Sequence, residues 1–166
     1  MLKIYIASDH AGVERKSEIL KQLLDHRWIP EVKREVFDLG PQSLDSVDYP
    51  DFADVVSKKI HGFSLVQNQP TTETTKTYPT EIGILICGSG QGMAMRANKH
   101  PHVRAALCWS AETARLSREH NDANVLCFGS RLIDLETSVQ VVQMFLTTSF
   151  AGGRHAGRVA KVSTPV

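Results

Sequence analysis

The sequence E-I-G-I-L-I-C-G-S-G-Q-G, which runs from Glu81 to Gly92, decides the fold of this chain. Its first half, Ile82 to Ile86, is a short apolar run rich in β-branched residues, a pattern typical of a fully buried strand in a parallel sheet. The turn that follows is rich in glycine and leads into residues with helical character. A strand that passes through such a turn into a helix N-terminus presents backbone N–H groups to an anion.

Cys87 lies where this strand ends, and two interpretations of it stay open. The N–H groups of the turn and the helix dipole would favour a thiolate, provided that they lower the thiol pKa from its ordinary value of about 8.5. Alternatively, Cys87 is a small buried hydrophobic residue on a tight turn, since free cysteines are among the most buried residues. The turn residues are Gly88, Ser89, Gly90 and Gly92.

Short apolar runs alternate with helical patterns along the chain. The runs predict strands over residues 3–7, 35–39, 82–86, 103–108 and 124–128. The apolar spacing elsewhere predicts helices over residues 13–26, 50–60, 93–98, 111–118 and 134–146. This alternation is typical of βαβ units, so we expect an α/β protein with a Rossmann-like, three-layer α/β/α fold and a five-stranded parallel sheet. We expect residues 1–166 to form a single domain.

The composition excludes several classes of partner. The 166 residues carry a net charge of +1, which gives no electrostatic reason to expect nucleic acid or a membrane surface as a partner. No apolar run approaches membrane-spanning length, and the N-terminus has no signal-peptide pattern. Three cysteines without a C-x-x-C motif argue against a disulfide framework and for a reducing, cytoplasmic setting.

Two segments depart from the regular alternation. Residues 67–80 contain many threonines, two prolines and almost no apolar side chain, so we expect a flexible surface loop inserted into the domain. Residues 151–166 are expected to form a C-terminal arm, in which Arg154 and Arg158 are spaced about one helical turn apart.

Most of the polar side chains that could take part in catalysis or binding are expected just after strands, at the edge of a parallel sheet where ligands bind. Asp9 and His10 follow the first strand, and Asp48 and Tyr49 precede a proline that fits a first helical turn. Structural alternatives remain: Asp9 as a helix N-cap, His10 as a solvated turn residue, and Tyr49 as a staple between helix and sheet. Only the C-terminal tail is expected to lie away from this edge.

Basic and titratable side chains near the C-terminus are a second source of chemistry. His120–Asn121 lies at a predicted helix C-terminus, where His120 could act as a general acid or base or simply cap the helix. Arg131, Arg154 and Arg158 carry guanidinium groups that suit phosphate oxygens, although a solvated basic tail is the alternative. The seven histidines lack metal-ligand spacing and the glycine turn matches no nucleotide fingerprint, so we expect no metal and no cofactor.

Eight segments of the chain together match one family's pattern. They are S-D-H-A-G (8–12), D-Y-P (48–50), G-I-L-I-C-G-S-G-Q-G (83–92), A-N-K (97–99), R-A-A-L-C (104–108), S-R-E-H-N-D-A-N-V-L (117–126), G-S-R (129–131) and G-G-R-H-x-x-R (152–158). In these segments the chain resembles the ribose-5-phosphate isomerase B family, which includes the galactose-6-phosphate isomerase subunits. The segments occur in the family's order across nearly the whole chain, and residues 67–80 look like an insertion.

The resemblance implies aldose–ketose isomerisation of a phosphorylated sugar without a metal. Cys87 is then the base that moves a proton between C2 and C1 of the opened sugar. Some relatives have a Glu base just after the last glycine of the loop; Met93 stands there, so this chain resembles the cysteine type. Ser89 would assist proton movement at the sugar oxygens, the loop N–H groups would stabilise the enediolate, and His120 would open the furanose ring.

The resemblance also implies the substrate-binding residues. For the phosphate they are His10, Arg131, Arg154 and Arg158, and for the sugar they are Asp9, Asp48, Tyr49 and Asn121, with His155 beside them. Family members are dimers, often paired into tetramers, with active sites between two subunits. We therefore expect a homodimer or tetramer in which the C-terminal arm reaches a neighbour's site.

The expected reaction is the interconversion of ribose 5-phosphate and ribulose 5-phosphate in the pentose phosphate pathway. Two alternatives stay open. One is the same chemistry on a six-carbon sugar phosphate, such as allose or galactose 6-phosphate. The other, from a different class, is a non-catalytic phosphosugar-binding module on the same scaffold.

Overall fold

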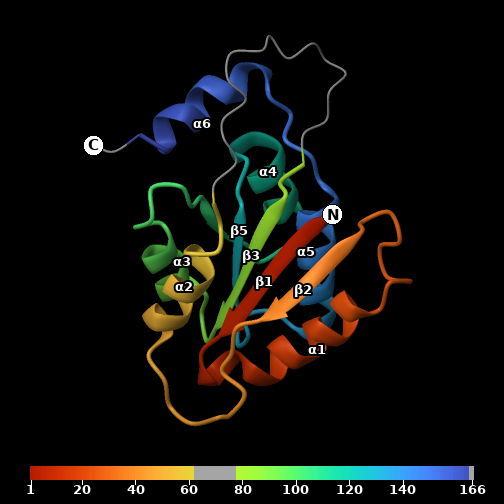
Figure 1. The fold of residues 1–166 in the computed structure, drawn as a ribbon, viewed down its shortest axis with the longest axis vertical. Helices are drawn as coiled ribbons and strands as arrows, with labels where there is room; N and C mark the ends of the chain where they lie inside the picture. Colours follow the sequence, from red (N-terminus) through yellow and green to blue (C-terminus); the bar gives the residue numbers. More distant parts are fainter. Residues whose placement is uncertain (62–77, 165–166) are drawn as a thin grey trace.

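The computed structural model describes residues 1–61 and 78–164 of the chain. Its centre is one sheet of five parallel strands in the order β2-β1-β3-β5-β4 (Figure 1). The strands are β1 (Leu2–Ser8), β2 (Arg34–Asp38), β3 (Glu81–Cys87), β4 (Ala105–Leu107) and β5 (Val125–Gly129). The α/β class and the five-stranded parallel sheet predicted from the sequence are confirmed.

Helices cover both faces of this sheet and complete three layers. On one face, a core of buried side chains joins the sheet to α1 (Val13–Leu24), α4 (Ala111–Asn121) and α5 (Leu135–Thr147). On the other face, a second core joins the sheet to α2 (Tyr49–Ser57) and α3 (Gln91–Ala97).

The central strand β3 is apolar at consecutive positions because both of its faces are covered. Ile82, Ile84 and Ile86 belong to the core shared with α1, α4 and α5. Leu85 and Cys87 belong to the core shared with α2 and α3. This alternation accounts for the continuous apolar run from which the strand was predicted.

The order of the strands reverses direction at β1. From β1 the chain adds β2 on one side of the sheet and later adds β3 on the other. In open parallel sheets, the loops that leave the two strands at such a point separate, and ligands bind in the crevice between them. The loops after Ser8 and Cys87 are the two that leave this point.

Several element boundaries differ from prediction by a few residues, and two of them have a visible physical reason. β4 is shorter than the predicted 103–108, because the backbone N–H of Arg104 donates to the side chain of Asn124 (2.8 Å) instead of joining a strand ladder. The helix predicted over 111–118, with its end among residues 119–122, continues to Asn121. It ends at Asp122, whose φ of 47° is in the left-handed region.

The C-terminal arm contains regular structure that the sequence did not predict. It begins with a 3-10 turn, η2 (Gly153–His155), and continues as α6 (Ala156–Val162). Most of the loop predicted at 67–80 lies outside the described residues. Within residues 1–61 and 78–164, none of the helices combines the length and the apolar character that crossing a bilayer requires.

Gly12 allows the turn after β1 to pack against β3. A Cβ atom at Gly12 would lie 2.5 Å from the carbonyl oxygen of Ile86 and 2.9 Å from the Cβ of Ser8. A carbonyl of the central strand cannot move aside freely, so we expect Gly12→Ala to lower the free energy of unfolding by about 1–3 kcal/mol, measured by urea denaturation. In the control Gly157→Ala, the Cβ meets nothing within 4 Å and alanine is the better helix former, so no loss is expected. Equal stability of the two variants would contradict the packing argument.

Candidate active site

The turn after β1 carries two of the predicted site residues. Oδ1 of Asp9 accepts hydrogen bonds from two backbone N–H groups of the 3-10 turn η1 (His10–Gly12), at 2.9 and 3.1 Å. The capping interpretation of Asp9 is therefore confirmed. Nδ1 of His10 accepts from the backbone N–H of Val47 at 3.4 Å, so the neutral ring has its proton on Nε2. His10 then offers an N–H donor of the kind that suits an oxyanion.

Cys87 ends β3 and is only 5% exposed. Its sulfur accepts a hydrogen bond from the backbone N–H of Gly90 at 3.0 Å. Gly90 has a φ of 78°, and a Cβ atom there would lie 2.6 Å from Leu107 and 2.7 Å from the backbone of Phe128. Only glycine fits both requirements, and in this conformation it turns its N–H group onto the sulfur.

Two side chains from other elements lie on glycines of this loop. A Cβ atom at Gly88 would lie 3.3 Å from Nη1 of Arg131, so the guanidinium group passes over that glycine. A Cβ atom at Gly92 would lie 2.5 Å from the ring of Tyr49. Ser89, between the two glycines, is exposed. A cation, a phenol and a hydroxyl thus surround a loop of backbone N–H donors.

Asp48 and Tyr49 open α2 beside this loop. Asp48 occupies the N-cap position, but its side chain makes no capping hydrogen bond and is exposed. Tyr49 is 41% exposed, and its contact with Gly92 joins α2 to α3. The ring of Tyr49 therefore lies beside the loop that follows β3. The Asp48 carboxylate has no capping role at the helix terminus.

Two residues that the sequence did not single out hold the loop after β5 against this site. Ser130 donates its backbone N–H to the carbonyl of Cys87 (2.9 Å) and its hydroxyl to the carbonyl of Ala11 (2.8 Å). Arg15 of α1 donates to the carbonyl of Ser130 at 3.3 Å. Together they fix the loop that carries Arg131. The only signal in the sequence is that Ser130 falls within the G-S-R segment.

The other predicted site residues come from α4 and the C-terminal arm. His120 and Asn121 form the end of α4, whereas Arg154 and His155 belong to η2 and Arg158 to α6. The rings of His120 and His155 are stacked, with centroids 4.3 Å apart and planes 6° apart. The helix end and the arm thus form one continuous group of basic and titratable side chains.

The stacked pair has a defined electrostatic character. Desolvation, together with the charges of His120, Arg154 and Arg158, lowers the pKa of His155 from its ordinary value. His155 is therefore mostly neutral at neutral pH, and the stack does not hold two imidazolium charges against each other.

These two groups of residues lie at opposite ends of the strands. The group around Cys87 is at the carboxyl ends, and the group around His120 is at the amino ends. Cys87 ends β3, whereas Asn121 lies shortly before β5 begins, beside the start of β3, because Gly83 pairs with Val125. The strand from Gly83 to Cys87 spans about 13 Å. Figure 1 likewise places α6 at the end from which the strands start. The expectation that only the tail would lie away from the carboxyl edge was wrong, since His120 and Asn121 lie away from it too.

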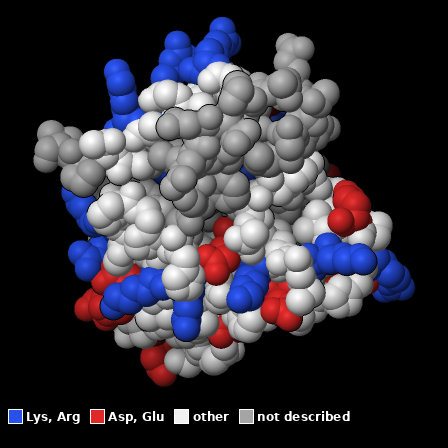
Figure 2. Space-filling model, turned by 45° about the horizontal axis from the view of Figure 1, so that its top comes forward, with Lys and Arg blue, Asp and Glu red and all other residues white. Residues whose placement is uncertain are grey.

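The arm makes its end of the molecule basic. Residues 151–166 include Arg154, Arg158 and Lys161 and no Asp or Glu. Figure 2, in which this end is turned toward the viewer, shows Lys and Arg side chains gathered at the upper margin with no Asp or Glu among them. A local positive potential of this kind attracts a phosphorylated ligand.

The chemistry available is that of proton transfer on an anionic substrate. The first group offers a thiol, N–H donors and a guanidinium group, and the second offers two imidazoles and two guanidinium groups. Within the part of the chain that the structure describes, no group of three or more His, Cys, Asp and Glu side chains is arranged to hold a metal ion. A base beside N–H donors that can receive negative charge is the arrangement that proton abstraction next to a carbonyl requires.

Known proteins with similar sequences are isomerases. A family model described as Ribose/Galactose Isomerase matches residues 4–162. The probable ribose-5-phosphate isomerase B of Mycoplasma pneumoniae is 44% identical over 160 residues, which cover 96% of this chain and 91% of that protein. The ribose-5-phosphate isomerase B of Escherichia coli is 37% identical over 163 residues, which cover 98% of this chain and 95% of that protein.

A solved structure has the same fold at substantial sequence identity. The ribose-5-phosphate isomerase B of Mycoplasma genitalium with bound ribulose-5-phosphate matches with a TM-score of 0.80 and 39% identity, covering 98% of this chain and 94% of that one. The chain therefore belongs to the ribose/galactose isomerase family, and the resemblance found in its sequence is confirmed.

The three cysteines differ in their surroundings, which gives a test of Cys87. Burial raises the pKa of Cys108 to about 11 and also raises the pKa of Cys127, and both thiols lie in the cores. At pH 8 only about one in a thousand Cys108 thiols is ionised. Iodoacetamide is therefore expected to alkylate Cys87 well before the other two, as measured by mass spectrometry of the native protein. The native Cys87→Ala variant should stay unmodified over the same time; alkylation of that variant at the wild-type rate would contradict the assignment.

Proposed function

We propose that this chain is an aldose–ketose isomerase that interconverts ribose 5-phosphate and ribulose 5-phosphate in the pentose phosphate pathway. The observation that carries the proposal is the sulfur of Cys87 on the N–H of Gly90 (3.0 Å), in a glycine loop covered by Arg131. Family membership supports isomerase chemistry. The names of the relatives, and the ribulose-5-phosphate bound to one of them, support a five-carbon substrate.

The proton-transfer step needs a base and a place for negative charge. Cys87, as the thiolate, removes the proton from C2 of the open-chain aldose, and the electron pair of that C–H bond forms the enediolate. The N–H groups of the glycine loop stabilise the oxyanion that forms. Cys87 then returns the proton to C1, while the proton on O2 moves to O1 with help from the hydroxyl of Ser89. The product is the ketose.

Ring opening precedes this step, because ribose 5-phosphate is mostly a closed furanose. His120 moves the proton of the anomeric hydroxyl to the ring oxygen, so it acts in turn as base and acid. The neutral ring of His155, stacked at 4.3 Å, supports the orientation of His120 without adding a second charge. Asn121, adjacent on the helix, contacts a sugar hydroxyl.

The remaining residues bind the two ends of the substrate. His10, Arg131, Arg154 and Arg158 hold the phosphate, and this binding energy, remote from the reacting carbons, orients C1 and C2. Asp9, Asp48 and Tyr49 contact sugar hydroxyls. Both capping bonds of Asp9 use Oδ1, so Oδ2 is the atom that would accept from the sugar.

The same proposal includes a second copy of the chain. The group around Cys87 and the group around His120 lie at opposite edges of one sheet, so one chain cannot bring both to one sugar. A homodimer, alone or paired into a tetramer, would place the Cys87 edge of one copy against the His120 edge of the other. Three free cysteines, one of them the proposed base, suit a reducing cytoplasm.

A coupled assay with ribose 5-phosphate, allose 6-phosphate and galactose 6-phosphate tests the reaction. We expect a strong preference for ribose 5-phosphate and a loss of kcat of roughly 100- to 10,000-fold in Cys87→Ala, because a general base contributes about that much. Cys108→Ala, a core cysteine, is the control and should keep most activity. Preference for a six-carbon sugar would show that this sugar, and not ribose 5-phosphate, is the substrate. A folded protein that turns over none of the three sugars would contradict the enzyme proposal and favour a phosphosugar-binding module.

Mixed oligomers test whether two copies share a site. Cys87→Ala damages one residue group and Arg154→Ala damages the other, so a hybrid dimer contains one intact site. After subunit exchange, equal amounts of the two variants are expected to recover about a quarter of wild-type activity, because about half of the dimers are hybrids with one working site of two. No recovery despite demonstrated exchange would contradict the shared site.

A further inference from the structure

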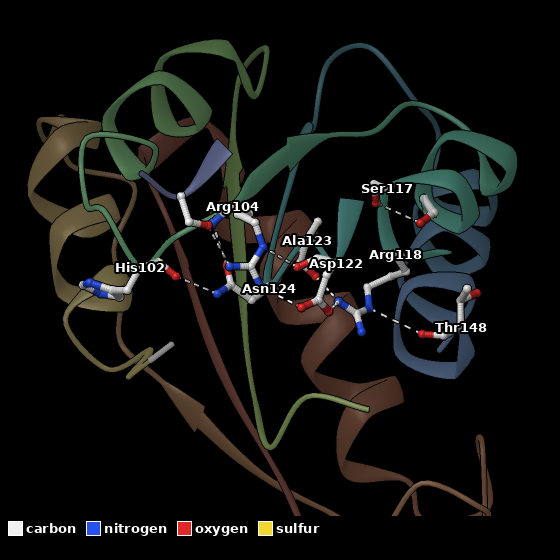
Figure 3. Close-up of polar contacts among 10 residues, drawn as sticks. His102, Arg104, Ser117, Arg118, Asp122, Ala123, Asn124 and Thr148 are labelled. Atoms are coloured by element: carbon white, nitrogen blue, oxygen red, sulfur yellow. Dashed lines mark hydrogen bonds and ion pairs between the residues drawn. The ribbon is translucent and has the colours of Figure 1, made fainter. Parts of the chain in front are cut away.

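Three buried charged side chains near the end of α4 have no part in the proposed chemistry. The carboxylate of Asp122 accepts from Nη2 of Arg104 at Oδ2 (2.8 Å) and from Nη1 of Arg118 at Oδ1 (2.9 Å), as Figure 3 shows. Arg118 is 0% exposed, and Arg104 and Asp122 are each 7% exposed. We refer to these three residues as the Arg–Asp–Arg cluster.

The cluster fixes the place where α4 ends. Asp122 is the residue in the left-handed conformation that terminates the helix, directly after His120 and Asn121. Nε of Arg104 also donates to the backbone carbonyl of Asp122 at 2.8 Å. The last turn of α4 is therefore held both through its backbone and through a buried carboxylate, and the positions of His120 and Asn121 depend on it.

The same two arginines reach both ends of the C-terminal arm. Nε of Arg118 contacts the carbonyl of Thr148, where the arm leaves α5, at 3.4 Å (Figure 3). Nη1 of Arg104 contacts the hydroxyl of Ser163, at the end of α6, at 3.4 Å. Arg154 and Arg158, two of the residues proposed to hold phosphate, lie between these two attachment points. The cluster thus connects the helix end that carries the imidazole to the arm that carries the guanidinium groups.

Stability alone does not account for the cluster. Two guanidinium groups share one carboxylate, so a net positive charge is kept away from water, and burial lowers the pKa of Arg118. Nη2 of Arg118 is buried without a hydrogen-bond partner among the described residues. Apolar side chains of similar volume often stabilise a protein as well as, or better than, a buried ion cluster. Apolar side chains, however, would not supply hydrogen bonds of fixed direction to three separate segments.

We propose that Arg104, Arg118 and Asp122 are positioning residues that hold the imidazole of His120 and the C-terminal arm in the relative geometry that the shared site needs. This inference rests on the proposed function, because it gives the cluster a role in the group of residues that a second copy contributes. It assigns no contact with substrate to any of the three.

Asp122→Asn is the variant of choice. Asparagine has the same shape and tolerates a positive φ, so the end of the helix is preserved while the charge between the two arginines is removed. We expect kcat/KM for ribose 5-phosphate to fall roughly 100-fold, because small displacements of catalytic groups have effects of that size.

Asp54→Asn is the matched control. The Asp54 carboxylate likewise accepts from two basic side chains, Arg96 (2.8 and 2.6 Å) and His100 (2.9 Å), but it joins α2 to α3 outside both groups of site residues. Because the Arg96 side chain is 45% exposed, Asp54→Asn is expected to lose less stability than Asp122→Asn, while kcat/KM stays within about twofold of wild type. A similar loss of kcat/KM in both variants would overturn the positioning role.

Hybrid oligomers distinguish positioning from general damage. Asp122→Asn mixed with Cys87→Ala should recover about a quarter of wild-type activity, because one site in each hybrid then combines an intact Cys87 with an intact cluster. Asp122→Asn mixed with His120→Ala should recover none, since both changes affect the same group. Recovery with His120→Ala, or no recovery with Cys87→Ala, would overturn the proposal.

Failure of the proposal can be told apart from failure of the shared site. If Cys87→Ala recovers with Arg154→Ala but not with Asp122→Asn, the cluster is not a positioning device and the shared site stands. If neither mixture recovers, the shared site is wrong and the proposal is overturned with it.

Arg104→Lys keeps the test decisive if Asp122→Asn does not fold. Lysine retains the positive charge facing Asp122 but loses the fork that also reaches Ser163. The arm is then less well fixed, so KM for ribose 5-phosphate is expected to rise several-fold while kcat changes less. A folded Arg104→Lys variant with an unchanged KM would overturn the proposal.

Discussion

All five strands run in the same direction, and this constraint separates the proposed site residues into two groups. Residues that follow a strand collect at one edge of the sheet, and residues that end a returning helix collect at the other. Cys87 belongs to the first kind and His120 to the second. Because β3 lies between the two edges, no adjustment of a loop within one chain can join them. The proposal of a second copy therefore rests on the topology.

Each edge is organised by a different kind of interaction. At the Cys87 edge the geometry is made by backbone: Gly90 brings its N–H group onto the sulfur, and Gly88 and Gly92 leave room for side chains that a larger residue would exclude. At the His120 edge it is made by buried charge, since one carboxylate between two arginines connects the end of α4 to the arm. A tight loop suits oxyanion stabilisation, whereas long side chains suit the alignment of separate segments.

The sequence predicted the features that depend on local pattern. The apolar run of β3 and the glycines after it were sufficient for the strand, the turn and the position of Cys87 at its end. The sequence predicted that α4 ends among residues 119–122, but not the buried partners that hold this end, such as Arg118 on Asp122. It also did not predict that the arm is helical, because that is decided by contacts distant in the chain. Ser130 acts through hydrogen bonds to two backbone carbonyls, and its only signal in the sequence is its place in the G-S-R segment.

The central claim is that one sugar phosphate is held between the Cys87 edge of one copy and the His120 edge of another. A crystal structure of the Cys87→Ala variant with ribose 5-phosphate tests it most directly. The account predicts C1 and C2 of the sugar beside the glycine loop of one copy, with His120 and Arg154 of the second copy in contact with the same molecule. A sugar bound entirely by one chain, with His120 and Arg154 facing solvent, would contradict it.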